Sequence, residues 1–167
     1  MLTLELGGEE WDEVGYLPEQ ANGSGMSGFL GSYHHQLDDK GRLSLPAAFR
    51  RDTSSAPFVL AQAFPDSLAL FPAATWAEVE DRLRELLRTD PAARSWFLGV
   101  TANAVEVVPD RQGRILIPER LREAANIGGS ALVVGAIDRI ELWDPDRFEA
   151  SVTPPSEDTT RFTHIFG

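Results

Sequence analysis

The 167-residue sequence predicts a β-rich α+β fold, in which two tandem copies of one module are joined by a connecting helical pair. Three observations predict this fold. A nine-residue motif recurs once at a fixed offset, which is the mark of an internal repeat. Short apolar runs bounded by Gly, Pro and Asp, typical of strands and turns, fill both copies. The segment between the copies has its apolar residues at helical spacing instead.

The internal repeat has an offset of 72 residues and needs no gap. The offset that superimposes the two motifs also pairs Arg50 with Arg122, and Leu70 with Leu142, further along the chain. A chance match would not keep this register, so we expect two halves that fold alike and pack as a pseudo-dimer. The two motifs are Asp38-Asp39-Lys40-Gly41-Arg42-Leu43-Ser44-Leu45-Pro46 and Asp110-Arg111-Gln112-Gly113-Arg114-Ile115-Leu116-Ile117-Pro118.

Each copy predicts the same series of elements. A strand (32–37 and 104–109) leads into a turn that Asp opens and that Gly41 or Gly113 makes possible through its permissive backbone. A short apolar strand (43–45 and 115–117) follows, and then a short helix (46–51 and 118–126). Pro46 and Pro118 suit the first turn of these helices, although no capping side chain precedes either proline. Two more strands complete each copy, at 58–63 with 68–71 and at 131–136 with 140–143.

Between the copies, Trp76, Val79, Leu83 and Leu86 have the spacing of an amphipathic helix over 76–88, and a second helix is expected over 91–101. Residues 157–166 are expected to form a short docking helix. The predicted organisation is therefore an N-terminal tail (1–28), a first module (29–76), connecting helices (77–103), a second module (104–148) and a C-terminal tail with a short helix (149–167).

The N-terminal tail is acidic and ends in a linker-like run of Asn, Gly and Ser just before Met26. Two interpretations stay open for it. It is either a disordered acidic tail, or the product of an upstream start codon chosen in error, with Met26 as the biological start. Neither interpretation gives the tail a part in the fold.

The net charge of −11 would argue against a nucleic-acid partner if the charge were spread evenly. It is concentrated at the two ends. Residues 1–25 hold six carboxylates and no Lys or Arg, and residues 138–167 hold seven carboxylates and three Arg. The motif regions are locally basic instead, so we expect positive potential around Lys40, Arg42, Arg50, Arg51, Arg111 and Arg114.

Several function classes have no support in the sequence. Cysteine is absent, which excludes disulfides and thiolate sites and fits the cytoplasm. We expect no secretory signal and no transmembrane helix. His34 and His35 would point to opposite faces of a strand, so no metal site is expected. No nucleophile elbow, phosphate-binding loop or zinc-protease motif occurs. We therefore expect no enzyme, no cofactor, no small-molecule substrate and no membrane partner.

The turn of the first motif carries chemistry suited to DNA. Arg42 offers two parallel donors that match guanine O6 and N7, and Lys40, the only lysine, offers a point charge to phosphate. The alternative for Asp38 and Arg42 is a local ion pair that braces the turn. For Arg50 and Arg51 it is a favourable position at a helix C-terminus. The second turn, with Arg111 and Gln112, is left as either a second DNA contact or a subunit contact.

The pattern Asp-x-x-Gly-Arg, followed by an apolar strand and Pro, resembles the SpoVT-AbrB module, and two copies in one chain of this size resemble the MraZ family. The ending 162–167 also suits that family. The resemblance implies swapped β-hairpins in a double-split β-barrel and a homo-oligomeric ring. It further implies a nucleoid-associated transcriptional regulator, a repressor, that binds direct repeats of double-stranded DNA upstream of cell-division and cell-wall genes, its own included.

The predicted DNA-binding residues are thus Lys40, Arg42, Arg50, Arg51, Arg111 and Arg114, and the predicted structural residues of the motifs are Asp38, Gly41, Pro46, Asp110, Gly113 and Pro118. Two other functions stay open. One is an antitoxin-like protein that binds a toxin partner as well as DNA, against which the duplication counts. The other is a structural ring protein that has lost DNA binding, an alternative that the acidic charge keeps open.

Overall fold

The structure is a computed structural model that describes residues 28–50 and 56–167. The acidic tail predicted over residues 1–28 lies outside the described residues except for Gly28, and so does Arg51. The interpretations of the tail and the DNA-binding role of Arg51 therefore remain predictions.

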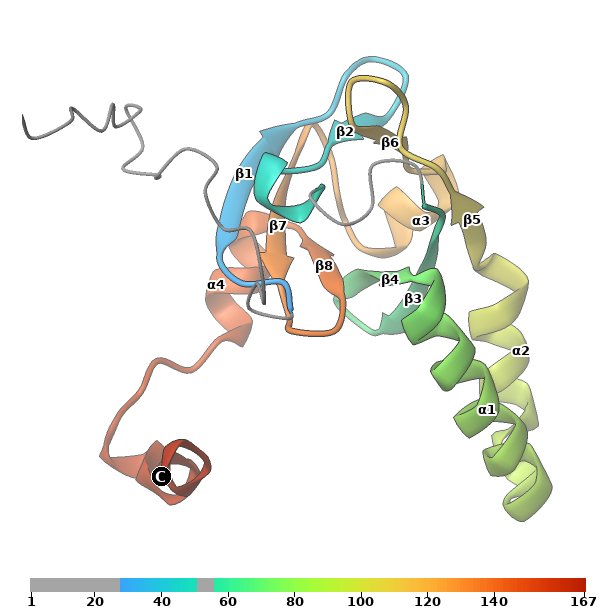
Figure 1. Ribbon diagram of the computed structural model, residues 1–167, viewed down its shortest axis with the longest axis vertical. Coiled ribbons are helices and arrows are strands. Elements are labelled where there is room, and N and C mark those ends of the chain that lie inside the picture. The colour runs from blue at the N-terminus through green and yellow to red at the C-terminus, as the bar shows by residue number, and fades with distance from the viewer. Residues whose placement is uncertain (1–27, 51–55) are drawn as a thin grey trace, which may run out of the picture.

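The described residues form two antiparallel sheets (Figure 1). Six strands build the larger sheet in the order β1-β7-β8-β4-β3-β5, and the two remaining strands pair as a ribbon, β2-β6. The strands are β1 Ser32–Gln36, β2 Arg42–Ser44, β3 Phe58–Phe64, β4 Ser67–Pro72, β5 Val105–Val107, β6 Arg114–Leu116, β7 Ser130–Gly135 and β8 Ile140–Trp143.

The two halves of the chain exchange strands. Strand β1 of the first half pairs with β7 of the second, and β5 of the second half pairs with β3 of the first. Two cross-strand pairs join residues related by the offset of 72: Leu43 with Ile115 in the ribbon, and Ala69 with Glu141 where β4 meets β8. These pairs mark a pseudo-twofold axis, so the predicted pseudo-dimer of two like halves is confirmed. Closure into a double-split barrel stays a prediction.

A single core lies between the sheet and the ribbon. Leu43 and Ile115 are fully buried on the inner side of the ribbon, and Leu70 and Leu142, another pair at the same offset, are fully buried in the sheet. Because each half supplies strands to the other, neither half could bury these side chains alone. Burial of a leucine-sized side chain contributes about 1.5–3 kcal/mol, which makes this shared core the main stabilising feature of the exchanged arrangement.

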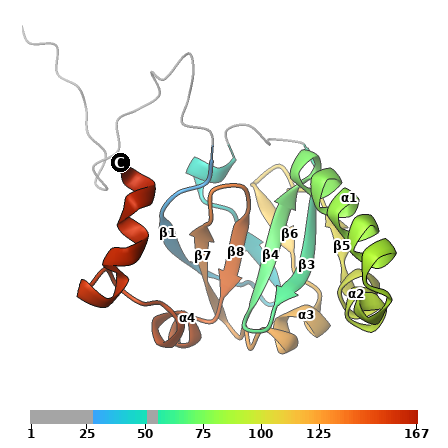
Figure 2. The ribbon, with the colours of Figure 1, turned by 90° about the horizontal axis from the view of Figure 1, so that it is seen from below.

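The connecting helical pair is confirmed as α1 Ala73–Thr89 and α2 Arg94–Asn103, with a short 3₁₀ turn, η2 Pro91–Ala93, between them. The Asp90 carboxylate accepts a hydrogen bond from the Ala92 amide and so caps that turn. Helix α1 lies along β4 and α2 lies on β3, and the pair projects from one side of the body (Figures 1 and 2).

The short helix expected over 46–51 is a single 3₁₀ turn, η1 Ala47–Phe49. Its amides bond three residues back, Phe49 to Pro46 and Arg50 to Ala47. The Phe49 ring is buried edge-on against Phe29 and Tyr33, at 5.4 and 5.3 Å between ring centroids. The second copy does form an α-helix, α3 Glu119–Ala124. Pro46 and Pro118 stand just before these elements and, as expected, neither element has a side-chain cap.

Helix α4 Pro145–Ser151 was not among the predicted elements. Its N-cap is Asp144, whose carboxylate accepts the Arg147 amide at 3.1 Å. The helix begins 72 residues after the start of α1, so the repeat itself carried the signal. Beyond it, the predicted C-terminal helix is the 3₁₀ segment η3 Glu157–Phe166, which stands away from the body on the side opposite α1 and α2 (Figures 1 and 2).

Candidate nucleic-acid interface

The first motif folds into a turn organised by one carboxylate. Asp38 accepts hydrogen bonds from the backbone amides of Lys40 and Arg42, at 3.0 and 2.8 Å, and from the Nε of Arg42 at 2.6 Å. Gly41 adopts a φ of +79°, a conformation that a residue with a Cβ enters only at a cost. The Asp, Gly and Arg of the motif are therefore the residues that this turn requires.

The second motif repeats the arrangement contact for contact. Asp110 accepts from the backbone amides of Gln112 and Arg114, both at 2.9 Å, and from the Nε of Arg114 at 2.8 Å. Gly113 has a φ of +74°. Both copies thus contain the local Asp–Arg ion pair, one of the two roles that the sequence leaves open for Asp38 and Arg42.

Both carboxylates have a lowered pKa. The backbone amide of Arg42 lowers the pKa of Asp38 below its usual range, with further contributions from the Arg42 guanidinium and the Lys40 amide. The pKa of Asp110 is lowered in the same way, first by the Arg114 amide and then by its guanidinium. At neutral pH both groups are ionised, so each holds its arginine in one orientation.

Each turn is also held by an arginine from the opposite copy. The Arg50 side chain packs on Gly113 and its Nη1 donates to the carbonyl of Gln112 at 3.4 Å. Its counterpart Arg122 packs on Gly41, where an added Cβ would lie 3.0 Å from the guanidinium carbon. Arg122 Nε also donates to the Ile117 carbonyl at 3.2 Å. At Gly113 an added Cβ would overlap the Arg50 side chain, so close packing is a second reason for glycine in the second turn.

The contacts of Arg50 and Arg122 with the turns limit what these two arginines can offer to DNA. The Nε of Arg50 is buried, so only part of its guanidinium remains for a phosphate, and its role in DNA binding stays a prediction. Arg122 was not among the predicted site residues. Its signal in the sequence was the offset that pairs it with Arg50.

The ribbon presents one face outward. Directly paired residues of antiparallel strands share a face. Because Leu43 and Ile115 are buried, their neighbours in each strand point the other way. We call this surface the outer face of the ribbon; it consists of Arg42, Ser44, Arg114 and Leu116.

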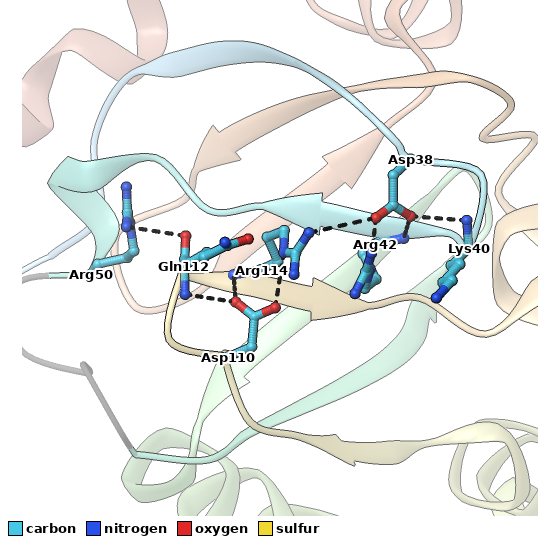
Figure 3. A network of polar contacts seen from close by, with 7 residues as sticks. All are labelled: Asp38, Lys40, Arg42, Arg50, Asp110, Gln112 and Arg114. Carbon is cyan, nitrogen blue, oxygen red and sulfur yellow. Dashed lines mark hydrogen bonds and ion pairs between the residues drawn. The ribbon is translucent and has the colours of Figure 1, made fainter.

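The two turns lie at opposite ends of the ribbon, with Arg114 between Asp110 and Asp38 (Figure 3). Its Nη1 is 3.9 Å from Asp38 Oδ2, so the two turns are linked electrostatically. Lys40 and Arg111 are exposed at the two ends. The structure therefore brings together four of the six predicted DNA-binding residues: Lys40, Arg42, Arg111 and Arg114.

The described residues were also compared with the requirements of a metal site and of a membrane span. Over residues 28–50 and 56–167, no group of three or more His, Cys, Asp or Glu side chains is arranged to hold a metal ion. In β1, His34 is exposed and His35 is half-buried, in the alternation expected of a strand. Burial and the nearby Arg50 lower the pKa of His35. Among the described residues, no helix combines the length and apolar character needed to cross a membrane.

The fold and the ribbon define a class of protein: a single chain of two duplicated β modules that exchange strands and present paired Asp-x-x-Gly-Arg turns. The family model described as "MraZ protein, putative antitoxin-like" matches residues 29–96 and 100–161. The chain belongs to the MraZ family.

Curated relatives bear the name transcriptional regulator MraZ. The protein of Moorella thermoacetica is 42% identical over 121 residues, which is 72% of this chain and 84% of the relative. That of Herpetosiphon aurantiacus is 39% identical with the same coverage of both chains. That of Thermomicrobium roseum is 39% identical over 122 residues, 73% of this chain and 85% of the relative. Membership in this family places the chain among transcriptional regulators.

Proposed function

We propose that this chain is a sequence-specific DNA-binding repressor that reads double-stranded promoter DNA with the outer face of the β2–β6 ribbon. The observation that carries the proposal is the outer face itself. It holds two arginines whose orientation is set by ionised carboxylates, and a further cation is exposed at each end. A two-stranded ribbon fits the major groove of B-DNA, where an arginine can pair with guanine. The resemblance to the family supports direct repeats upstream of cell-division and cell-wall genes, its own included, as the target, and the nucleoid as the location.

The charge distribution supports selective rather than general DNA binding. The chain carries −11 overall, yet Lys40, Arg42, Arg111 and Arg114 stand together at the ribbon and its turns, while carboxylates dominate residues 138–167. Long-range repulsion then opposes indiscriminate binding, and only a surface that fits the groove gains enough short-range contacts.

A ring of several copies would let many ribbons engage spaced repeats, and linked binding raises avidity by about 10²–10⁴. Two features support self-assembly. Phe162, Ile165 and Phe166 are exposed on η3, and on the opposite side of the body an open hollow of about 300 Å³ beside α1 and α2 is lined by Trp76, Leu83, Phe97 and Ala104 together with Glu80, Arg84 and Thr101. A free-standing short helix is marginal in water, so we assign η3 of a second copy to this hollow. A contact between unlike surfaces gives a ring where the rotation between copies closes and an open filament where it does not, so the proposed ring requires a rotation that closes.

Fluorescence anisotropy with duplex DNA from upstream of the chain's own gene tests DNA binding, with a shuffled duplex of the same composition as the control. We expect preference for the upstream DNA, and affinity that falls with salt by about 0.9 in log–log slope for each phosphate contact. Equal affinity for both duplexes, or no dependence on salt, would contradict the proposal.

Native mass spectrometry tests self-assembly. A chain that ends at Ser156, or the double variant Phe162→Ser and Ile165→Ser, is expected to form smaller assemblies than the full chain. The control variant Thr160→Ala leaves the apolar side chains in place and should assemble normally. An unchanged mass for the truncated chain would remove η3 from the interface.

The words "antitoxin-like" in the family description favour a second candidate function, binding of a small toxin. Co-expression with the products of the adjacent genes discriminates the two. A stable complex that releases the chain from DNA would support the antitoxin role. A chain that assembles into rings but binds neither DNA nor a neighbouring gene product would be a structural ring protein.

A further inference from the structure

Leu116 is an apolar side chain in the middle of the proposed DNA-binding surface. It is 54% exposed, and it pairs directly with Arg42 across the ribbon. Its neighbours in the chain are Ile115, within β6, and Ile117, just after it, and both are buried. The core therefore does not require an apolar residue at Leu116, since its side chain lies on the outer face.

The major groove offers one apolar group to a protein, the C5-methyl of thymine. Directly opposed residues of an antiparallel pair have their Cβ atoms about 4.5–5.5 Å apart, so Leu116 and Arg42 would meet neighbouring bases. The backbone pairing of β2 with β6 and the Asp38–Arg42 hydrogen bond of 2.6 Å keep the two side chains beside each other. An exposed leucine in this position gains by covering a methyl group from water.

The pseudo-twofold axis relates Leu116 to a residue of a different kind in the first copy. Its counterpart at the offset of 72 is Ser44, which pairs with Arg114 at the other end of the outer face. The ribbon therefore presents arginine beside leucine at one end and arginine beside serine at the other. A surface with unlike ends distinguishes the two directions along a duplex, although its backbone is nearly symmetric.

We propose that Leu116 forms a subsite for a thymine methyl group next to the base that Arg42 contacts, and that the difference between Leu116 and Ser44 makes the ribbon read DNA in one direction. This inference rests on the proposed function. It adds a specificity-determining residue that the Asp-x-x-Gly-Arg motif does not contain.

The test uses the full chain and DNA selected by it from a pool of random-sequence duplexes. In a selected duplex each thymine is replaced in turn by deoxyuridine, which removes only the methyl group. We expect one replacement to weaken binding of the wild-type chain by about fourfold, the effect of one buried methyl-sized group. Leu116→Ser should lose this sensitivity, whereas the matched control Leu98→Ser, an exposed leucine on α2, should keep it.

A second variant tests direction. Ser44→Leu should create a preference for thymine at the mirror-related position of the site. The inference is overturned if selected DNA binds equally well with deoxyuridine at every position, if Leu116→Ser keeps the sensitivity of the wild type, or if Leu116→Ser changes the mass of the assembly and so marks a subunit contact. Failure to enrich any sequence would instead refute the proposed function, and the inference with it.

Discussion

Replacing Arg42 with alanine removes the guanidinium that Asp38 holds on the outer face of the ribbon. Its Nε is engaged by Asp38 at 2.6 Å, and the side chain is 32% exposed. In the proposed interface the two terminal nitrogens of Arg42 are the donors left for a base. A guanidinium held in this way loses little freedom on binding a base, because its orientation is already set.

The expected loss of binding free energy is that of one arginine–guanine pair. A bidentate arginine–guanine pair contributes about 1–3 kcal/mol of discrimination, so Arg42→Ala should weaken binding to a selected promoter duplex by about 5- to 140-fold. Binding to a shuffled duplex should change far less. If Arg42 only met phosphate, affinity for both duplexes would fall together and the log–log salt slope would drop by about 0.9.

The assay is fluorescence anisotropy at several salt concentrations, with Arg82→Ala as the matched control. Arg82 lies on α1, is 67% exposed and pairs with Glu78 at 3.1 Å, so its loss changes the net charge equally without touching the ribbon. Thermal unfolding should show that both variants remain folded. An Arg42→Ala chain that is folded and binds like the Arg82→Ala control would remove Arg42 from the DNA interface and refute the reasoning.

Three further predictions concern stability. Gly113→Ala should lower the free energy of unfolding in urea by more than the cost of a left-handed backbone, about 1–2 kcal/mol, because the added Cβ would also overlap Arg50. The control Gly128→Ala, whose added Cβ would meet open space, should differ little from wild type. Leu43→Ala should cost about 2–5 kcal/mol by leaving a cavity on the pseudo-twofold axis, and a smaller loss would mean that the core is not shared there. In the wild-type chain, the lowered pKa of Asp38 gives stability that is complete above the usual value of 3.8 and is lost as the pH falls through the folded-state pKa. The variant Asp38→Asn lacks this carboxylate, so its free energy of unfolding should fall less steeply in acid. A wild-type acid limb in this variant would contradict the carboxylate's role.

The repeat predicted much of the fold because it is a property of the chain itself. Two turns, a connecting helical pair and a matching series of strands follow from apolar spacing and turn residues. The errors were local. The first short helix is only a 3₁₀ turn, because Phe49 packs against Phe29 and Tyr33. This contact joins segments that are distant in the sequence. Helix α4 was missed even though Asp144 and Pro145 are a strong helix start.

The candidate site was only partly predictable. The motif pointed to Lys40 and Arg42, because turn residues and cations stand together in the sequence. Arg122 and Leu116 depend on contacts between the copies, one across the turns and the other across the ribbon. The spacing of residues along one copy carries no information about which strand of the other copy lies beside it.

The sequence by itself determined that two like halves exist, where their turns lie, and why each turn needs Asp and Gly. These are local matters of backbone conformation and hydrogen bonding within five residues. Only the tertiary structure decided that the halves exchange strands, that each turn is braced by an arginine of the other half, and that Arg42, Arg114, Ser44 and Leu116 share one face. The physical reason is that pairing between distant strands is chosen by burial of a common core, which no single segment contains.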